Sequence, residues 1–327
     1  MSSDAALSKP EISIIVPFHN AEKFIRNSLN SLQAQNFSKF EVLMVNDCSS
    51  DGSEKIAQMF SEKDSRFRLI SLKDNEALKS HGVSKARNAG IYAASADYIV
   101  FLDSDDWLEK DTLSEAYSDA VSTGASIVQW NFSDEYDLRS SRRPFFPKGF
   151  FSVFENADMF TGFVTTALYK KSLIFDNGIF FDENISIGED ILFSLRCFIY
   201  SSVNYFTGKY LSHYRLKGNG LSHNISEARI KDFARVFTAF ENGLSEFERE
   251  KYSAVIFKIK LIMKKMALVT LAKPDYSLFY GIFSETNSML LKQKGLEGFV
   301  FLMIHLKLYF LLTPAIMLLK KIDARYS

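Results

Sequence analysis

Two patterns of apolar and polar positions alternate over the first hundred residues. Short apolar runs, typical of buried strands, occupy residues 12–16, 41–45, 67–72 and 98–102. Between them, apolar residues spaced three or four apart predict helices at residues 22–35, 53–61 and 83–94. Strands that alternate with helices in this way form βαβ units. We therefore expect an α/β fold whose parallel sheet carries helices on both faces.

The rhythm changes in the second part of the chain. Residues 126–132 read as one more strand and residues 189–200 as a helix, without the earlier alternation. From residue 226 onward the pattern is helical. The sequence therefore predicts an α/β body followed by a helical C-terminal part.

The strand at residues 98–102 ends in three carboxylates, Asp103, Asp105 and Asp106. Ligands of an α/β sheet bind outside the carboxyl ends of its strands, and side chains two apart on a strand share a face. Asp103 and Asp105 can therefore converge on a hydrated divalent cation, Mg²⁺ or Mn²⁺, since these ions prefer oxygen ligands. Asp106 stands three residues before Glu109, which is capping-box spacing, and is predicted to cap the next helix.

Two further polar segments flank predicted helices. Residues 45–53 (VNDCSSDGS) run from a strand through a turn into a helix. At the strand tip, Asp47 can accept a hydrogen bond from the imide N–H of a pyrimidine base, whereas Asp51 and Ser53 are predicted to form turn hydrogen bonds. Residues 84–90 (SKARNAG) form a helix of small residues that presents Arg87, which taken alone is compatible with a solvated surface arginine.

Composition and charge narrow the class of protein. The chain of 327 residues is 47% hydrophobic and 24% charged, which is ordinary for a globular protein. Its two cysteines, Cys48 and Cys197, cannot form a disulfide framework and suit a reducing cytosol. Residues 1–10 lack the apolar core of a signal peptide, so the body is expected in the cytoplasm.

The net charge of zero conceals an uneven distribution. Residues 251–327 hold twelve Lys and Arg against four Asp and Glu, a balance of +8, so the first 250 residues, with 27 against 35, carry −8. An acidic body argues against nucleic acid as a partner, because phosphate backbones require a basic footprint. The basic C-terminal part instead favours an anionic membrane surface.

Residues 299–319 are the most apolar stretch of this part. Their length would permit a span of about 20 residues, but Lys307 near the middle favours an interfacial helix. Residues 254–272 read as a basic amphipathic helix with four lysines, Lys258, Lys260, Lys264 and Lys265. The alternatives to membrane contact are a helical bundle packed on the catalytic domain and a dimer interface, and both are open.

Five segments, in this order along the chain, resemble the motifs of glycosyltransferase family 2, the inverting nucleotide-sugar transferases with the GT-A fold. They are residues 13–20 (SIIVPFHN), 45–53, 86–90 (ARNAG), 101–106 (FLDSDD) and 188–193 (GEDILF). The resemblance covers about residues 11–220 and implies a mostly parallel sheet flanked by helices. The expected domains are a catalytic domain at 1–225, with a nucleotide-sugar half at 11–124 and an acceptor half at 125–225, and a helical part at 226–327.

The resemblance implies roles for residues on the nucleotide side. Pro17 would lie against the nucleotide, and Asp47 would bind the base of a UDP-sugar, with dTDP- and GDP-sugars as alternatives. Arg87 would belong to the nucleotide-sugar site. Asp103 would touch the ribose or the water shell of the metal, and Asp105 would ligate the Mn²⁺ or Mg²⁺ that bridges the diphosphate.

On the acceptor side, Asp190 would be the general base that takes the proton from the acceptor hydroxyl, with Glu189 as the alternative base. Both stand where a helix begins, so charge matching to the helix dipole is the competing explanation. Arg215 and Lys217 lie in a stretch that resembles the segment closing over the diphosphate. His213 or His223, in the same stretch, could be a further metal ligand.

The implied activity is inverting transfer of a hexose or N-acetylhexosamine to a saccharide or lipid-linked saccharide acceptor in bacterial surface polysaccharide synthesis. Such an enzyme would work on the inner face of the cytoplasmic membrane, held by peripheral contact of its C-terminal helices. A sugar-nucleotide pyrophosphorylase would require a Gly-rich, basic phosphate loop after the first strand, which residues 17–20 (PFHN) do not provide. The other alternative is a catalytically silent glycan-binding or scaffold protein.

Overall fold

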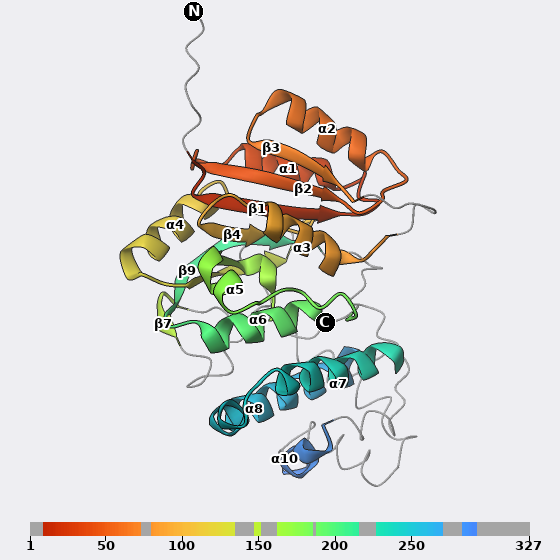
Figure 1. Ribbon diagram of the computed structural model, residues 1–327, viewed down its shortest axis with the longest axis vertical. Helices are drawn as coiled ribbons and strands as arrows, with labels where there is room; N and C mark the ends of the chain where they lie inside the picture. Colours follow the sequence, from red (N-terminus) through yellow and green to blue (C-terminus); the bar gives the residue numbers. More distant parts are fainter. Residues whose placement is uncertain are drawn as a thin grey trace, which may run out of the picture. The chain divides into compact units, whose positions relative to one another are not determined.

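The computed structural model describes residues 9–72, 80–134, 147–151, 162–185, 188–215, 227–270 and 283–292. Contacts divide the chain into two compact units. Unit 1 comprises residues 1–141, 145–151 and 162–215, and unit 2 comprises residues 142–144, 152–161 and 216–327. Figure 1 shows the strands in unit 1 and the long helices α7 and α8 in unit 2.

The described strands of unit 1 form one sheet in the order β3-β2-β1-β4-β8-β6-β9-β5, with β7 paired to β9. The strands are β1 (Ile12–Phe18), β2 (Phe40–Asn46), β3 (Phe67–Ser71), β4 (Tyr98–Phe101), β5 (Trp107–Leu108), β6 (Ile127–Asp134), β7 (Gly149–Phe151), β8 (Ala167–Lys170) and β9 (Asn204–Tyr214). β1 to β4 are mutually parallel, as the βαβ pattern predicts. The remainder is mixed, because β8 runs antiparallel to both β4 and β6 while β6 and β9 are parallel.

Helices cover both faces of the parallel strands, which explains why these strands read as unbroken apolar runs. Alternate residues of β1, such as Ile14 and Val16, enter a core formed with α1, α2 and α4, while Ile15 meets α3 on the opposite face. The helices of unit 1 are α1 (Ile25–Gln33), α2 (Ser53–Lys63), α3 (Val83–Ala93), α4 (Thr112–Thr123), α5 (Lys171–Asp176) and α6 (Glu189–Tyr200).

An aromatic cluster joins β4 to the later elements. Phe101 of β4 makes edge-to-face contacts with Tyr169 of β8, with Phe181 and with Phe193 of α6, at ring-centroid distances of 5.4–6.1 Å. Phe181 and Phe193 stack at 4.2 Å. Such ring pairs add roughly 0.5–1.5 kcal/mol each beyond area burial. The cluster therefore fixes the start of α6 beside the end of β4.

Unit 2 contains α7 (Glu227–Asn242), α8 (Glu246–Thr270), a 3₁₀ turn (Ser284–Thr286) and α10 (Asn287–Leu291). Lys260 of α8 is buried and forms ion pairs with Glu241 at 2.7 Å and Glu285 at 3.1 Å. Lys264 is also buried and donates to Asn287 Oδ1 at 2.6 Å.

The predicted helix at residues 254–272 is thus observed to Thr270, but two of its four lysines, Lys260 and Lys264, point into the unit. Of the alternatives for this helix, a helical bundle accounts for these two side chains. Among the described helices, none combines the length and the apolar character that a membrane crossing requires. The apolar stretch at residues 299–319 lies outside the described residues.

Candidate active site

The carboxyl ends of β1, β2 and β4 meet at one edge of the sheet and bring Pro17, Asp47 and Asp103 to that edge. β4 pairs with β1 only as far as Ile15, where the N–H of Leu102 donates to the Ile15 carbonyl at 3.0 Å. Pro17 lies beyond this last bond, where its missing N–H costs no hydrogen bond to β4. The strand geometry therefore places a proline at the tip of a central strand, beside residues 103–106, which we call the acidic turn.

Asp106 does not cap a helix, so that prediction was wrong. The chain after Asp106 stays extended as β5 and pairs with β9, and α4 begins only after Asp111. Asp106 is buried, and its Oδ1 accepts a hydrogen bond from the backbone N–H of Arg215 at 2.9 Å. Glu109, the partner in the expected capping box, instead contacts His213 Nε2 at 2.5 Å. Asp106 thus ties the end of β9 to the acidic turn.

Arg87 is the centre of an ionic network that links the acidic turn after β4 to the first turn of α6. One guanidinium nitrogen, Nη2, donates to Asp103 Oδ1 at 3.0 Å, and Nη1 donates to Glu189 Oε1 at 3.0 Å. The Arg87 side chain is 5% exposed and lies over the Phe181 ring, with its guanidinium carbon 5.2 Å from the ring centre. Arg87 is therefore a buried cation between the acidic turn and α6, not a solvated surface arginine.

The close packing of α3 on β1 sets the position of Arg87. A Cβ on Gly90 would stand 2.4 Å from Ile15 Cγ2, so only glycine allows α3 to pack this closely on β1. Asn88 also holds this arrangement: its Nδ2 donates to the Phe181 carbonyl and its Oδ1 accepts the Phe181 N–H, both at 2.9 Å. The motif at residues 86–90 contains Asn88 but does not reveal this positioning role, for which a polar amide among small helical residues is the sequence signal.

Glu189 and Asp190 form the first turn of α6, behind Gly188 at φ 82°. Removal from solvent and the neighbouring charge of Glu189 raise the pKa of Asp190 to about 7, although Arg87 and the Ile191 N–H oppose this rise. Burial alone would lower the pKa of Arg87, but Asp103, Glu189 and Asp190 outweigh it and raise that pKa. A carboxyl that titrates near neutrality is suited to general base catalysis.

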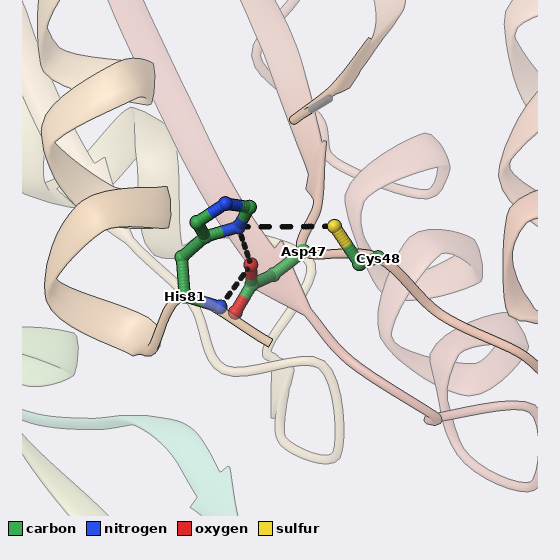
Figure 2. Close-up of side chains that lie close together, drawn as sticks. All are labelled: Asp47, Cys48 and His81. Atoms are coloured by element: carbon green, nitrogen blue, oxygen red, sulfur yellow. Dashed lines mark hydrogen bonds and ion pairs between the residues drawn. The ribbon is translucent and has the colours of Figure 1, made fainter. Parts of the chain in front are cut away.

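Asp47 lies at the tip of β2 with both carboxylate oxygens occupied. Oδ1 accepts the His81 N–H at 2.8 Å and contacts His81 Nδ1 at 3.1 Å, while Oδ2 accepts from Ser80 Oγ at 2.5 Å and from the Gly82 N–H at 2.9 Å. Figure 2 shows the His81 ring beside this carboxylate. Burial alone would raise the pKa of Asp47, but these hydrogen bonds lower it. A base N–H would therefore replace one of the present donors.

The turn roles expected next to Asp47 are confirmed. Asp51 Oδ1 accepts the Ser53 N–H at 3.0 Å, and its Oδ2 accepts the Glu22 N–H at 3.0 Å. Ser53 Oγ in turn accepts the N–H of Ala21 at 2.7 Å. These bonds fasten the loop after β1 to the start of α2.

Arg215 brings a second cation to the acidic turn. Its guanidinium carbon lies 5.0 Å from the centre of the Trp107 ring and 5.4 Å from that of Phe24, and its Nε donates to the Asp105 carbonyl at 3.1 Å. His213 is buried and stacks on Trp107 at 4.9 Å, with its nitrogens directed to Glu109 and Ser133. These contacts do not direct His213 to a metal at the acidic turn. Lys217 and His223 lie outside the described residues.

Comparison with known proteins identifies the family. The model described as glycosyl transferase family 2 matches residues 13–175. The chain belongs to glycosyltransferase family 2. Similar family members include the uncharacterized glycosyltransferase EpsJ of Bacillus subtilis, 33% identical over 58% of this chain and 56% of EpsJ. Another is the poly(ribitol-phosphate) beta-N-acetylglucosaminyltransferase TarS of Staphylococcus aureus, 30% identical over 58% of this chain and 32% of TarS.

The chain spans 31–56% of the length of three such relatives, GlyA of Streptococcus pneumoniae among them. Solved structures show the fold more completely. S. aureus TarS 1–349 in complex with UDP-GlcNAc aligns with 97% of this chain and 91% of its own, at a TM-score of 0.70 and 20% identity. The family's GT-A fold, expected from the motifs, is confirmed.

Proposed function

We propose that this protein is an inverting glycosyltransferase that moves a hexose or N-acetylhexosamine from a UDP-sugar to a saccharide or lipid-linked saccharide in bacterial surface polysaccharide synthesis. The observation that carries the proposal is the Arg87 network, in which one buried cation contacts Asp103 on the donor side and Glu189 on the acceptor side. Family membership supports a transferase over a pyrophosphorylase. TarS, a relative by sequence and by fold, has been solved with UDP and with UDP-GlcNAc.

The residues after β4 fit a hard divalent cation. Asp103 is 36% exposed at the strand tip and Asp105, two residues later, is half-buried, so the available ligands are two carboxylates with partial access to solvent. Such a set suits Mg²⁺ or Mn²⁺, which retain several waters and bind substrate phosphates. The mannosyltransferase PcManGT, similar in fold at a TM-score of 0.59, was solved with GDP-Man and Mn²⁺. When bound, the ion would neutralise charge on the departing nucleoside diphosphate.

The donor would lie along the edge formed by β1, β2 and β4. Pro17 would contact the nucleotide and Asp47 would accept the imide N–H of uracil in place of one of its present donors. Arg215 would neutralise a phosphate, since its guanidinium is held beside Asp105 by Phe24 and Trp107. Lys217, two residues further along, is proposed for the same task.

Asp190 would accept the proton of the acceptor hydroxyl as that oxygen attacks the anomeric carbon in line with the departing diphosphate. Its raised pKa provides a base strong enough for this transfer at neutral pH. Glu189 accepts a hydrogen bond from the Arg87 guanidinium at 3.0 Å, and the charge of that guanidinium limits the rise in the pKa of Asp190. The helix-dipole explanation accounts for acids at this position but not for the buried arginine that joins them to Asp103.

We further propose that the C-terminal part holds the enzyme on the inner face of the cytoplasmic membrane. The support is the +8 balance of residues 251–327 and the apolar stretch at 299–319. Since Lys260 and Lys264 are paired inside unit 2, residues 299–319 are the main candidate for the contact.

A panel of nucleotide sugars, assayed for hydrolysis with Mn²⁺, with Mg²⁺ and with excess chelator, tests this function. We expect metal-dependent release of UDP from one or more UDP-sugars, and less or no cleavage of ADP-sugars. Cleavage that is unaffected by chelator would contradict the metal role. Binding of glycans without cleavage of any donor in the panel would favour the scaffold alternative.

A further inference from the structure

Asp47, Cys48 and His81 place three different metal-ligating atoms together at the tip of β2. The three atoms all lie within 4.8 Å of one another, with Asp47 Oδ1 3.1 Å and Cys48 Sγ 3.7 Å from His81 Nδ1. Figure 2 shows the Asp47 and Cys48 side chains both directed to the same ring nitrogen. Asp47 also accepts hydrogen bonds from residues 80–82, and the Cys48 thiol donates to the Leu72 carbonyl at 3.3 Å, a bond that the thiol would give up when its thiolate binds an ion.

We propose that Asp47, Cys48 and His81 form a binding site for Zn²⁺ or a similar thiolate-binding cation, separate from the Mg²⁺ or Mn²⁺ site at Asp103 and Asp105. A mixed set of thiolate, imidazole and carboxylate ligands is typical of Zn²⁺, whereas Mg²⁺ requires oxygen ligands. Three protein ligands leave the fourth tetrahedral position for water or a ligand.

The distances are close to those that such an ion needs. With Zn–N and Zn–O of about 2.0–2.1 Å and Zn–S of about 2.3 Å, tetrahedral ligand atoms stand roughly 3.3–3.6 Å apart. The Asp47–His81 and Cys48–His81 distances bracket this range at 3.1 and 3.7 Å. The remaining pair, Asp47 and Cys48, lies within 4.8 Å.

The surroundings support the ligands on both sides. Asp47 Oδ2 accepts hydrogen bonds from Ser80 Oγ and the Gly82 N–H, so the carboxylate stays oriented while Oδ1 turns to the ion. Asp47 and Cys48 are buried, whereas the His81 side chain is 20% exposed and provides a path of entry. Binding would release the thiol proton of Cys48 to solvent, since the thiolate is the ligand.

One consequence rests on the proposed function. If Asp47 accepts the uracil N–H, an ion on its carboxylate removes that acceptor, and Zn²⁺ would compete with UDP. The same protein would then be activated by Mg²⁺ or Mn²⁺ at Asp105 and inhibited by Zn²⁺ at Asp47. The apparent dissociation constant for UDP would rise with Zn²⁺ concentration, while metal binding alone requires no assumption about the sugar.

Titration of the full chain with Co²⁺, in the presence of saturating Mg²⁺ to occupy the oxygen-only site, tests the proposal. We expect one equivalent of Co²⁺ with a thiolate charge-transfer band, displaced by Zn²⁺. Cys48→Ser and His81→Ala should each lose the band, and Ser80→Ala should weaken binding roughly 10-fold through the orientation of Asp47. Cys197→Ser is the matched control, because Cys197 is the other cysteine and is buried in α6; it should keep the band.

The outcomes separate this site from the proposed function. Absence of the band in the parent protein, or its persistence in Cys48→Ser, overturns the site, and circular dichroism verifies that each variant is folded. Calorimetry with UDP is then repeated with and without Zn²⁺. Co²⁺ binding through Cys48 without any UDP binding would keep the site and refute the nucleotide function. UDP binding without the thiolate band would do the reverse.

Discussion

Replacing Arg87 by methionine removes the cation that joins the acidic turn to α6 and leaves its carboxylates facing one another. Removing one partner of a buried ion pair costs about 3–5 kcal/mol. Asp103 is 36% exposed, so its share is reduced by solvent screening, whereas Glu189 is 12% exposed and accounts for most of the effect. We therefore expect Arg87→Met to lower the free energy of unfolding by about 3 kcal/mol at pH 8.

The unfolding free energy lost in Arg87→Met should be larger at pH 8 than at pH 5.5. Arg87 opposes the rise in the pKa of Asp190, so its loss raises that pKa further above 7. A carboxyl whose folded-state pKa exceeds its unfolded value contributes stability at low pH that is lost as the pH rises through the folded pKa. At pH 5.5, where Asp190 is protonated, the deficit should be smaller by roughly 1 kcal/mol, since one pKa unit corresponds to about 1.4 kcal/mol.

Urea unfolding followed by tryptophan fluorescence measures this effect in the relevant unit, because both tryptophans of the chain, Trp107 and Trp130, lie in unit 1. Arg87→Lys should recover part of the stability, since an ammonium keeps the charge but not the two-pronged contact. Arg26→Met, at an exposed position on α1, is the matched control and should change stability by no more than about 0.5 kcal/mol. A loss of unfolding free energy below about 1 kcal/mol for Arg87→Met would show that Arg87 does not hold the buried carboxylates. An equal loss at both pH values would show that Arg87 does not influence the titration of Asp190.

Three further predictions concern the proposed donor, base and membrane contact. Asp190→Asn should lower kcat by roughly 10²- to 10⁴-fold with little change in UDP affinity measured by calorimetry, whereas an equal loss of UDP binding would point to a structural role. The activity of the parent protein should rise with pH through an apparent pKa near 7. UDP should bind more tightly than ADP, with GDP between them, and Asp47→Ala should narrow the difference; equal affinities in the parent would discredit Asp47 as the base contact. The full chain should float with anionic liposomes, less so in high salt, whereas a chain ending near residue 272 that still binds UDP should not float; equal flotation of both would exclude the C-terminal contact.

The parallel half of the fold was predictable because its signals are local. Each of β1 to β4 is an apolar run between polar turns, and α2, α3 and α6 begin at the predicted residues. Asp103 stands at a strand tip as expected, because the apolar run itself marks where β4 ends. The turn roles of Asp51 and Ser53 follow for the same reason, since their hydrogen bonds span few residues or join adjacent loops.

The remaining features depend on partners far away in the sequence. β5 has two residues and exists only through pairing with β9, so Asp106 and Glu109 retained the spacing of a helix cap without a helix to cap. Arg87 meets Glu189 across 102 positions of sequence. No local pattern specifies such a contact, because it results from the packing of α3 on β1 and of α6 on the aromatic cluster.

Proton NMR of an α-linked UDP-sugar incubated with the protein and Mg²⁺ tests the proposed metal-dependent, inverting transfer, provided that spectra are recorded before the released sugar equilibrates between anomers. The Asp103/Asp105 site and a base at Asp190 predict consumption of the donor, release of UDP, and the β-anomer as the first sugar product. Asp105→Asn, folded by circular dichroism, should leave the donor intact. First appearance of the α-anomer would contradict inversion, and equal turnover by Asp105→Asn would contradict a metal site at Asp105.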